Sequence, residues 1–200
     1  MEPVVIIPYE KNKTIDFYED RFCFAKYEIL YESVNGYSYS ITHTTGLVYF
    51  IPLANSTRIA FTIDDGSKKL KSFNKEIAAG LTYKGKGQAR VETIFSELAY
   101  CLDKYIAPIV FRKLLEEIVE YGYVEIGGLK ICKDHLAIKG FFKEKYLSYS
   151  EYGSSITAQG TVTVYSKDNK YFFSCLIGVM NAPILGTLID CLAEWDINSK

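Results

Sequence analysis

The side chains of this 200-residue chain that could carry nucleophilic or metal chemistry are two histidines and five cysteines. His43 and His135 are far apart, and no His-x-x-x-His, Cys-x-x-Cys or mixed Cys/His spacing accompanies them. A zinc site needs its ligands clustered in space, so we expect no metal site. Cys132 lies three residues before His135, but on a single strand these two side chains would point to opposite faces. That spacing argues against a catalytic thiol–imidazole pair.

Adjacent carboxylates and one glycine-rich stretch are the remaining candidates for catalysis. Glu19-Asp20 and Asp64-Asp65 fall in expected turns, and Glu116-Glu117 falls on a helix surface. Solvent does not raise a carboxyl pKa, so none of these pairs is a suitable general acid. Lys84-Gly-Lys-Gly lacks the spacing of a phosphate-binding loop and is typical of a solvated basic loop. We therefore expect a non-enzymatic protein with no catalytic residue and no cofactor.

One loop combines aromatic and basic side chains: Phe141, Phe142, Lys143 and Lys145. Lysines attract anionic lipid headgroups, and protruding aromatic rings insert at a membrane surface. These four residues are the tentative contact site for a lipid or another partner. The alternative is a hydrophobic pair that covers the mouth of a β-barrel, beside lysines that are simply solvated.

Composition narrows the class of partner and the compartment. The net charge of −1 gives no basic excess for nucleic acid, so we expect no nucleic-acid partner. Five cysteines in apolar segments, without a Cys-x-x-Cys pair, favour a reducing compartment. The N-terminus lacks a basic signal-peptide region, and no stretch reaches the roughly 20 apolar residues of a membrane span. We expect a soluble, cytoplasmic protein.

Two segments have the apolar spacing of amphipathic helices. The first runs from about 89 to 121, and Pro108 inside it predicts a kink or break near Ile106. Gly122 is typical of the residue just beyond a helix C-terminus. The second runs from about 181 to 196, with Asn181 as its N-cap and Pro183 in its first turn.

Short alternating segments rich in β-branched and aromatic residues predict strands elsewhere, in keeping with 17 Tyr and 12 Phe. Asn35-Gly36 is the strongest hairpin signal in the chain. Residues 68–87 are mostly interpreted as a loop. The expected strands are 4–7, 15–18, 21–24, 27–34, 37–44, 47–51, 58–63, 123–126, 129–132, 135–138, 146–152, 161–165 and 171–177.

The two halves of the sequence share a pattern. Residues 15–24 align with residues 129–138 at a constant offset of 129 − 15 = 114. Apolar residues alternate in both segments, around Glu19-Asp20 in the first and Lys133-Asp134 in the second. In both halves the strands are followed by an amphipathic helix. Two homologous domains explain this pattern, and one larger β domain with an inserted helix is the alternative.

The second half resembles small bacterial pleckstrin-homology-like (PH-like) domains. The resemblance covers residues 123–195: the hairpin of 129–139, the later hairpin of 161–177, and the helix entry at Asn181-Ala-Pro-Ile-Leu. It implies an α+β fold of two PH-like antiparallel β-barrel or sandwich units, each closed by a C-terminal amphipathic helix. The expected domains are 1–121 and 122–200. The resemblance is structural and implies no site residues.

The expected function is a binding or scaffold module with a protein or peptide partner. One alternative is recognition of a lipid headgroup or membrane surface. Another is a small-ligand carrier or an enzyme that uses a barrel cavity, which requires a pocket above roughly 300 Å³. The first helix could also bury a second face against another copy of the chain in a homodimer.

Overall fold

The computed structural model describes residues 2–48, 51–79, 86–140 and 143–198. The chain is an α+β protein with antiparallel sheets, and it divides into two compact units, Met1–Ile109 (unit 1) and Val110–Lys200 (unit 2). The described residues form four separate sheets that are not closed into barrels.

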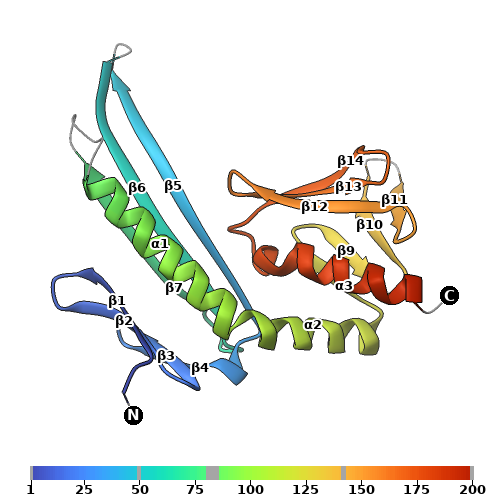
Figure 1. Ribbon diagram of the computed structural model, residues 1–200, viewed down its shortest axis with the longest axis horizontal. Coiled ribbons are helices and arrows are strands. Elements are labelled where there is room, and N and C mark those ends of the chain that lie inside the picture. Colours follow the sequence, from blue (N-terminus) through green and yellow to red (C-terminus); the bar gives the residue numbers. More distant parts are fainter. Residues whose placement is uncertain (1, 49–50, 80–85, 141–142, 199–200) are drawn as a thin grey trace. The chain divides into compact units, whose positions relative to one another are not determined.

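Unit 1 consists of a four-stranded sheet, a three-stranded sheet and a helix (Figure 1). Both sheets are meanders in which each strand pairs with its neighbour in sequence. Helix α1 contacts β1 and β6. The elements are β1 (Val5–Glu10), β2 (Lys13–Phe17), β3 (Arg21–Phe24), β4 (Tyr27–Leu30), β5 (Gly36–Val48), β6 (Ile51–Asp64), β7 (Lys71–Ala79) and α1 (Lys86–Tyr105).

Unit 2 repeats this order after helix α2 (Ala107–Tyr121), and its final helix packs on the three-stranded sheet through β12 and β13. A short 3₁₀ turn at Ala182–Ile184 leads into that helix. The elements are β8 (Tyr123–Ile126), β9 (Leu129–Cys132), β10 (His135–Lys139), β11 (Glu144–Ser148), β12 (Tyr152–Ala158), β13 (Thr161–Ser166), β14 (Tyr171–Leu176) and α3 (Leu185–Asn198).

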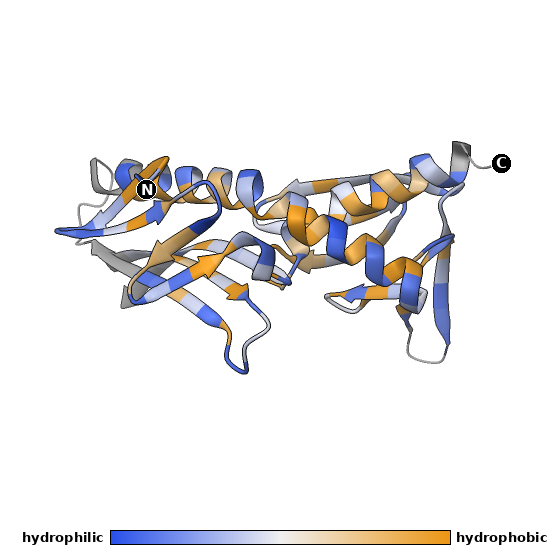
Figure 2. Cartoon of the chain, turned by 90° about the horizontal axis from the view of Figure 1, so that it is seen from below, coloured by the Kyte–Doolittle hydropathy of each residue, from blue (hydrophilic) through white to orange (hydrophobic). Residues whose placement is uncertain are grey.

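The offset of 114 residues aligns equivalent strands of the two units. Residues 15–24 form the β2–β3 hairpin, and residues 129–138 form the β9–β10 hairpin. Both hairpins supply the second and third strands of a four-stranded sheet. Their alternate apolar side chains are buried, and Figure 2 shows hydrophobic and hydrophilic residues alternating along the strands. The buried set is Ile15, Phe17, Phe22, Phe24, Leu129, Ile131 and Leu136.

A buried tyrosine fixes the same turn in both units. Tyr31 directly follows β4, and its hydroxyl donates to the carbonyl oxygen of Tyr18 at 2.9 Å. Tyr149 directly follows β11, and its hydroxyl donates to the carbonyl oxygen of Cys132 at 2.6 Å. The two acceptors are 132 − 18 = 114 residues apart, the offset that aligns the hairpins. The two units therefore share a specific hydrogen bond as well as the pattern of apolar residues.

A second tyrosine contact ties each three-stranded sheet to its helix. On β5, Tyr37 and Tyr39 donate to the two carboxylate oxygens of Asp103 on α1, each at 2.8 Å. In unit 2, Tyr152 at the start of β12 donates to Asp190 on α3 at 2.5 Å. Since these tyrosines are buried, each carboxylate satisfies a hydroxyl that would otherwise be desolvated without a partner.

The helical prediction for residues 89–121 is confirmed with its break, because α1 and α2 are separated at Ile106. Pro108 has no N–H to donate and stands in the first turn of α2, where that donor is not needed. The N-cap prediction is wrong in detail. Asn181 makes no side-chain cap hydrogen bond, and its φ of 64° places it in the left-handed region before the 3₁₀ turn.

The Asn35-Gly36 hairpin prediction is wrong. A 3₁₀ turn at Tyr31–Ser33 carries the chain out of the first sheet, and β4 and β5 lie in different sheets. Gly36 begins β5 opposite Asp64, and the Asn35 N–H donates to the Asp64 carbonyl oxygen at 2.7 Å. Local turn propensity is overridden here by pairing with a strand much later in the chain.

The loop prediction for residues 68–87 is also wrong over much of its length, because β7 occupies Lys71–Ala79 and pairs with β6. The charged residues of β7 hide the alternation of a strand, and only the partner strand supplies the reason for its extended form. The expected strands 37–44 and 58–63 lie within the long β5 and β6. The expected strand 47–51 instead spans the end of β5 and the first residue of β6, and residues 49–50 lie outside the described residues. Lys84-Gly85 lies outside the described residues.

Candidate binding surfaces

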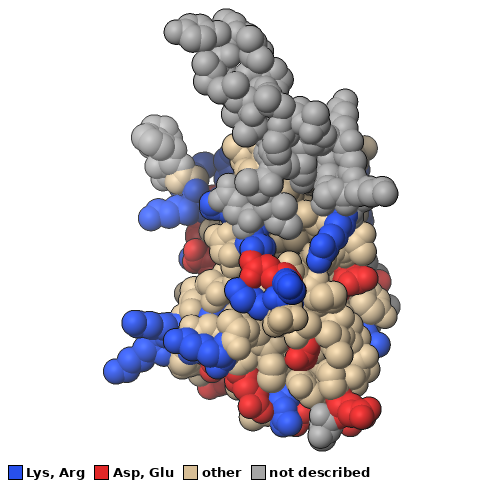
Figure 3. All heavy atoms as spheres, turned by 90° about the vertical axis from the view of Figure 1, so that its left-hand side faces the viewer, with Lys and Arg blue, Asp and Glu red and all other residues tan. Residues whose placement is uncertain are grey.

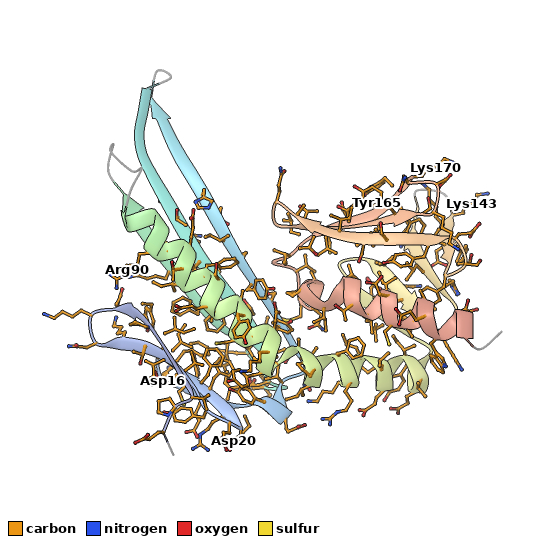
Figure 4. All side chains as sticks on the ribbon, in the orientation of Figure 1. Asp16, Asp20, Arg90, Lys143, Tyr165 and Lys170 are labelled. Atoms are coloured by element: carbon orange, nitrogen blue, oxygen red, sulfur yellow. The ribbon has the colours of Figure 1, made fainter. Side chains whose placement is uncertain are left out.

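The predicted contact loop joins β10 to β11. Phe141 and Phe142 lie outside the described residues. Lys143 is exposed just before β11, and Lys145 is exposed on β11 opposite Ile138 (Figure 4 labels Lys143). Along β11, Lys145 shares its face with the buried Leu147, whereas Glu144 and Tyr146 point to the other face. The described part of the predicted site is therefore an exposed pair of lysines at one end of a sheet.

This loop is where unit 2 departs from unit 1. The tyrosines after the fourth strands, Tyr31 and Tyr149, are 149 − 31 = 118 residues apart, four more than the offset of 114. The extra four residues fall between Ile138 and Lys145, because the equivalent pair in unit 1, Phe24 and Tyr27, encloses only a two-residue turn. A Cβ on Gly140 would collide with the Lys143 carbonyl oxygen, so the lengthened loop requires glycine there.

The outer side of β8–β11 carries a connected group of polar and aromatic side chains, the tyrosine face: Tyr123, Lys130, His135, Glu144 and Tyr146. Glu144 is central, accepting from the Tyr146 hydroxyl at 2.8 Å and from the Lys130 ammonium at 3.1 Å. That ammonium lies 5.4 Å from the ring centre of Tyr123, and the His135 ring meets Tyr146 edge-on at 5.4 Å. Tyr146 and Tyr123 remain 61% and 47% exposed.

Electrostatics on the tyrosine face follow from these contacts. The hydrogen bond from Tyr146, followed by that from Lys130, lowers the pKa of Glu144. The same carboxylate raises the pKa values of Lys130 and Tyr146. Glu144, Lys130 and Tyr146 are thus held in their ordinary protonation states at neutral pH. Such a face suits recognition better than proton transfer.

Strand β11 is an edge of its sheet, since it pairs with β10 alone among the described strands. Its pairing with β10 is regular, without a bulge, and it contains neither Pro nor Gly. Three of the other edge strands are less open than β11. Edge strand β1 contains Pro8 and a register shift, β12 is bulged and contacts α3, and the Cys175 side chain of β14 lies close to Gly127.

Cys132 and His135 are not on one strand, as the sequence analysis assumed. They flank the two-residue turn between β9 and β10 and face each other across it. Burial, with a contribution from Asp134, raises the pKa of the Cys132 thiol, which opposes thiolate formation. The His135 Nδ1 atom lies 2.7 Å from Asp134 Oδ1, and no catalytic pair results.

Unit 1 carries a cavity of about 390 Å³ on its first sheet, above the volume that a small-ligand site requires. Its lining includes Asn12, Lys13, Thr14, Asp16 and Cys23 from β1–β3 and their turns. Sequence reasoning missed this cavity and also the tyrosine face. The inward alternation of Ile15 and Phe17 implied that Asp16 faces outward, but only the pairing of separate strands brings its neighbours beside it.

Across the part of the chain that the structure describes, no cluster of three or more His, Cys, Asp or Glu is placed to hold a metal ion. None of the described helices has the length and apolar character needed to cross a bilayer. In the view of Figure 3, basic and acidic side chains are interspersed with uncharged ones. No protein-family model matches this chain, and none of the curated proteins matches it in sequence.

Proposed function

We propose that this chain is a non-enzymatic binding protein made of two PH-like units, and that unit 2 binds an extended polypeptide by strand addition to β11. The PH likeness is supported by the order of elements, four strands, three strands and then a helix, which occurs in both units. Fold does not dictate function, so the proposal rests on the surface rather than on the likeness.

The observation that carries the proposal is a regularly paired edge strand, β11, that has an exposed aromatic side chain and pairs with β10 alone among the described strands. An edge strand presents unpaired backbone N–H and C=O groups and accepts a further strand readily. Tyr146 projects from β11 itself and is 61% exposed. An added antiparallel strand would place alternate side chains beside Glu144 and Tyr146 of β11 on the tyrosine face, where aromatic contact with Tyr146 gives specificity.

The charged groups of the tyrosine face already pair with one another, and this determines which partner side chains would fit there. Lys130 and Glu144 neutralise each other at 3.1 Å, so the face has no strong demand for a charged side chain. A β-branched or aromatic residue facing Tyr146 is the better match. A second copy of this chain would also qualify if its β11 paired antiparallel with the first, which sedimentation would detect as a dimer.

Strand addition predicts a specific mutational pattern. Tyr146→Lys is expected to weaken binding of phage-selected extended peptides by about tenfold or more, because it removes an aromatic contact worth at least ~1.4 kcal/mol. Tyr171→Lys on β14 is the matched control, since Tyr171 is 64% exposed and should leave Kd unchanged. Hydrogen exchange should show peptide-dependent protection of β11. Protection confined to other strands, or equal Kd values for both variants, would contradict strand addition.

The second candidate is contact with an anionic membrane through the β10–β11 loop. The four-residue insertion and the exposure of Lys143 and Lys145 favour it. Lys143→Ala/Lys145→Ala should reduce partitioning onto phosphatidylserine vesicles by about thirtyfold, from ~1 kcal/mol per lysine. Lys68→Ala/Lys69→Ala, in an exposed turn of unit 1, is the control. Equal sedimentation of wild type and both variants would rule out this loop as a membrane contact.

A further inference from the structure

We infer that the cavity on the first sheet of unit 1 is a binding site for a cationic amine or guanidinium group, with Asp16 as its acceptor. This site is separate from β11 and goes beyond the function proposed for unit 2. The cavity measures about 390 Å³, large enough for a small ligand or for one long side chain of a partner.

Asp16 supplies the chemical reason. It lies on β2, directly opposite Cys23 of β3, on the face opposite to the buried Ile15 and Phe17 (Figure 4 labels Asp16). Its Oδ1 atom is buried and has no hydrogen-bond partner among the described residues. A buried carboxylate oxygen without a donor is costly, so a donor from outside the chain would stabilise the site. Charge-assisted donors, ammonium and guanidinium, satisfy a carboxylate best.

The nearby lysine of the cavity lining does not pair with Asp16. Lys13 also lines the cavity, but its ammonium is 2.6 Å from Glu10 Oε2, and Lys75 forms an ion pair with the other oxygen of the same carboxylate. Glu10 therefore engages both lysines, and within the described part of the chain Asp16 is left as the acceptor without a paired cation. Asn12 and Thr14 add neutral polar groups for orientation, and Tyr9 and Phe24 add aromatic surface to the lining.

In unit 2, the sheet position that corresponds to Asp16 is held by a lysine. The residue equivalent to Asp16, at the offset of 114, is Lys130. Its ammonium lies between the carboxylate of Glu144 and the ring of Tyr123, so the pairing is complete within the chain. Unit 1 presents a carboxylate at this position and aromatic residues nearby, but none of its described residues places an ammonium on that carboxylate. The comparison indicates which group is missing in unit 1.

The test titrates the full chain with butylamine and butylguanidine, and with butanol and butyrate as neutral and anionic ligands of matched size. We expect saturable amide shifts at Thr14, Asp16 and Cys23 with both cations and none with the controls. Asp16→Asn should weaken binding by about tenfold or more, the loss of a charge-assisted bond. Asp20→Asn, an exposed carboxylate at the β2–β3 turn, should leave Kd unchanged. Absence of saturation, or equal shifts with butanol, would overturn the inference.

A second variant keeps the test decisive if Asp16→Asn fails to fold. Cys23→Lys places an ammonium directly opposite Asp16, as a cross-strand pair. It should abolish amine binding and raise the thermal midpoint, and unaltered amine binding would count against the site. The source of the cation is identified by comparing an extended peptide that contains one arginine with N-acetylarginine amide. Tenfold tighter binding of the peptide would identify a polypeptide as the source, and equal affinities would identify a free amine. Tyr146→Lys should leave amine binding unchanged, which separates this site from β11.

Discussion

Phe22→Ala is expected to lower the free energy of unfolding of unit 1 by about 3–5 kcal/mol, the usual cost of removing a fully buried phenylalanine ring. Phe22 has no solvent exposure, and it lies at the centre of the aromatic core of the unit. Its ring centre is 5.4 Å from that of Phe17, 5.7 Å from Phe24 and 6.2 Å from Tyr31. The loss would therefore leave a cavity that stacked, rigid neighbours fill poorly.

Urea unfolding and hydrogen exchange of the β2–β3 amides measure this effect. Leu30→Ala is a suitable control, because it also shortens an apolar side chain but on a residue 51% exposed at the edge strand β4. We expect this control to lower the free energy of unfolding by less than about 1 kcal/mol. A Phe22→Ala protein as stable as the control would show that the aromatic core of β2 and β3 does not hold unit 1 together.

Raising the pH above 10 is expected to unfold the chain cooperatively, because five buried tyrosines ionise only with difficulty in the folded state. Burial is the largest cause that raises their pKa values, and in three of them the carboxylates of Asp103 or Asp190 add to it. The five are Tyr31, Tyr37, Tyr39, Tyr149 and Tyr152.

The sign follows from proton linkage. In the unfolded chain these hydroxyls lose their protons near the ordinary pKa of 10.0, whereas the folded chain retains them to higher pH. Above pH 10 the unfolded state therefore binds fewer protons, and stability falls by up to about 1.4 kcal/mol per pH unit for each tyrosine. Below pH 10 the contribution is fully present.

Near-ultraviolet tyrosinate absorbance and circular dichroism, followed together, test this prediction. The five buried tyrosines should ionise in the same step that abolishes the dichroism. Tyr149→Phe should make the loss of stability with rising pH less steep, whereas Tyr171→Phe should leave that slope unchanged. Ionisation of all tyrosines near pH 10 with the dichroism unchanged would contradict the assigned burial.

How much of this fold could be predicted depended on the range of the interactions. The β2–β3 and β9–β10 hairpins were predicted correctly, because a two-residue polar turn between alternating apolar segments is a local signal. The break at Ile106 was also local, since it follows from the covalent structure of Pro108. The Asn35-Gly36 hairpin failed because pairing of Gly36 with Asp64 outweighs a turn preference spanning two residues.

The candidate sites were harder to predict for the same reason. The tyrosine face needs Lys130 and Glu144, which lie on strands that are not adjacent in sequence, to come within 3.1 Å. The cavity in unit 1 needs the β1–β2 turn and β3 to enclose Asp16. Lys143 and Lys145 were correctly expected at an exposed position, but their role as a contact site stays a prediction.

By itself, the sequence determined the alternation of the strands, the two-residue turns and the repeat at 114 residues. These depend on side-chain period and backbone sterics within a few residues. Long-range packing was needed to establish which tyrosines became buried hydrogen-bond donors, which strands lie at sheet edges, and which carboxylate has no paired cation among the described residues. Those outcomes depend on residues far apart in the chain, such as Tyr37 and Asp103, and no local pattern records their approach.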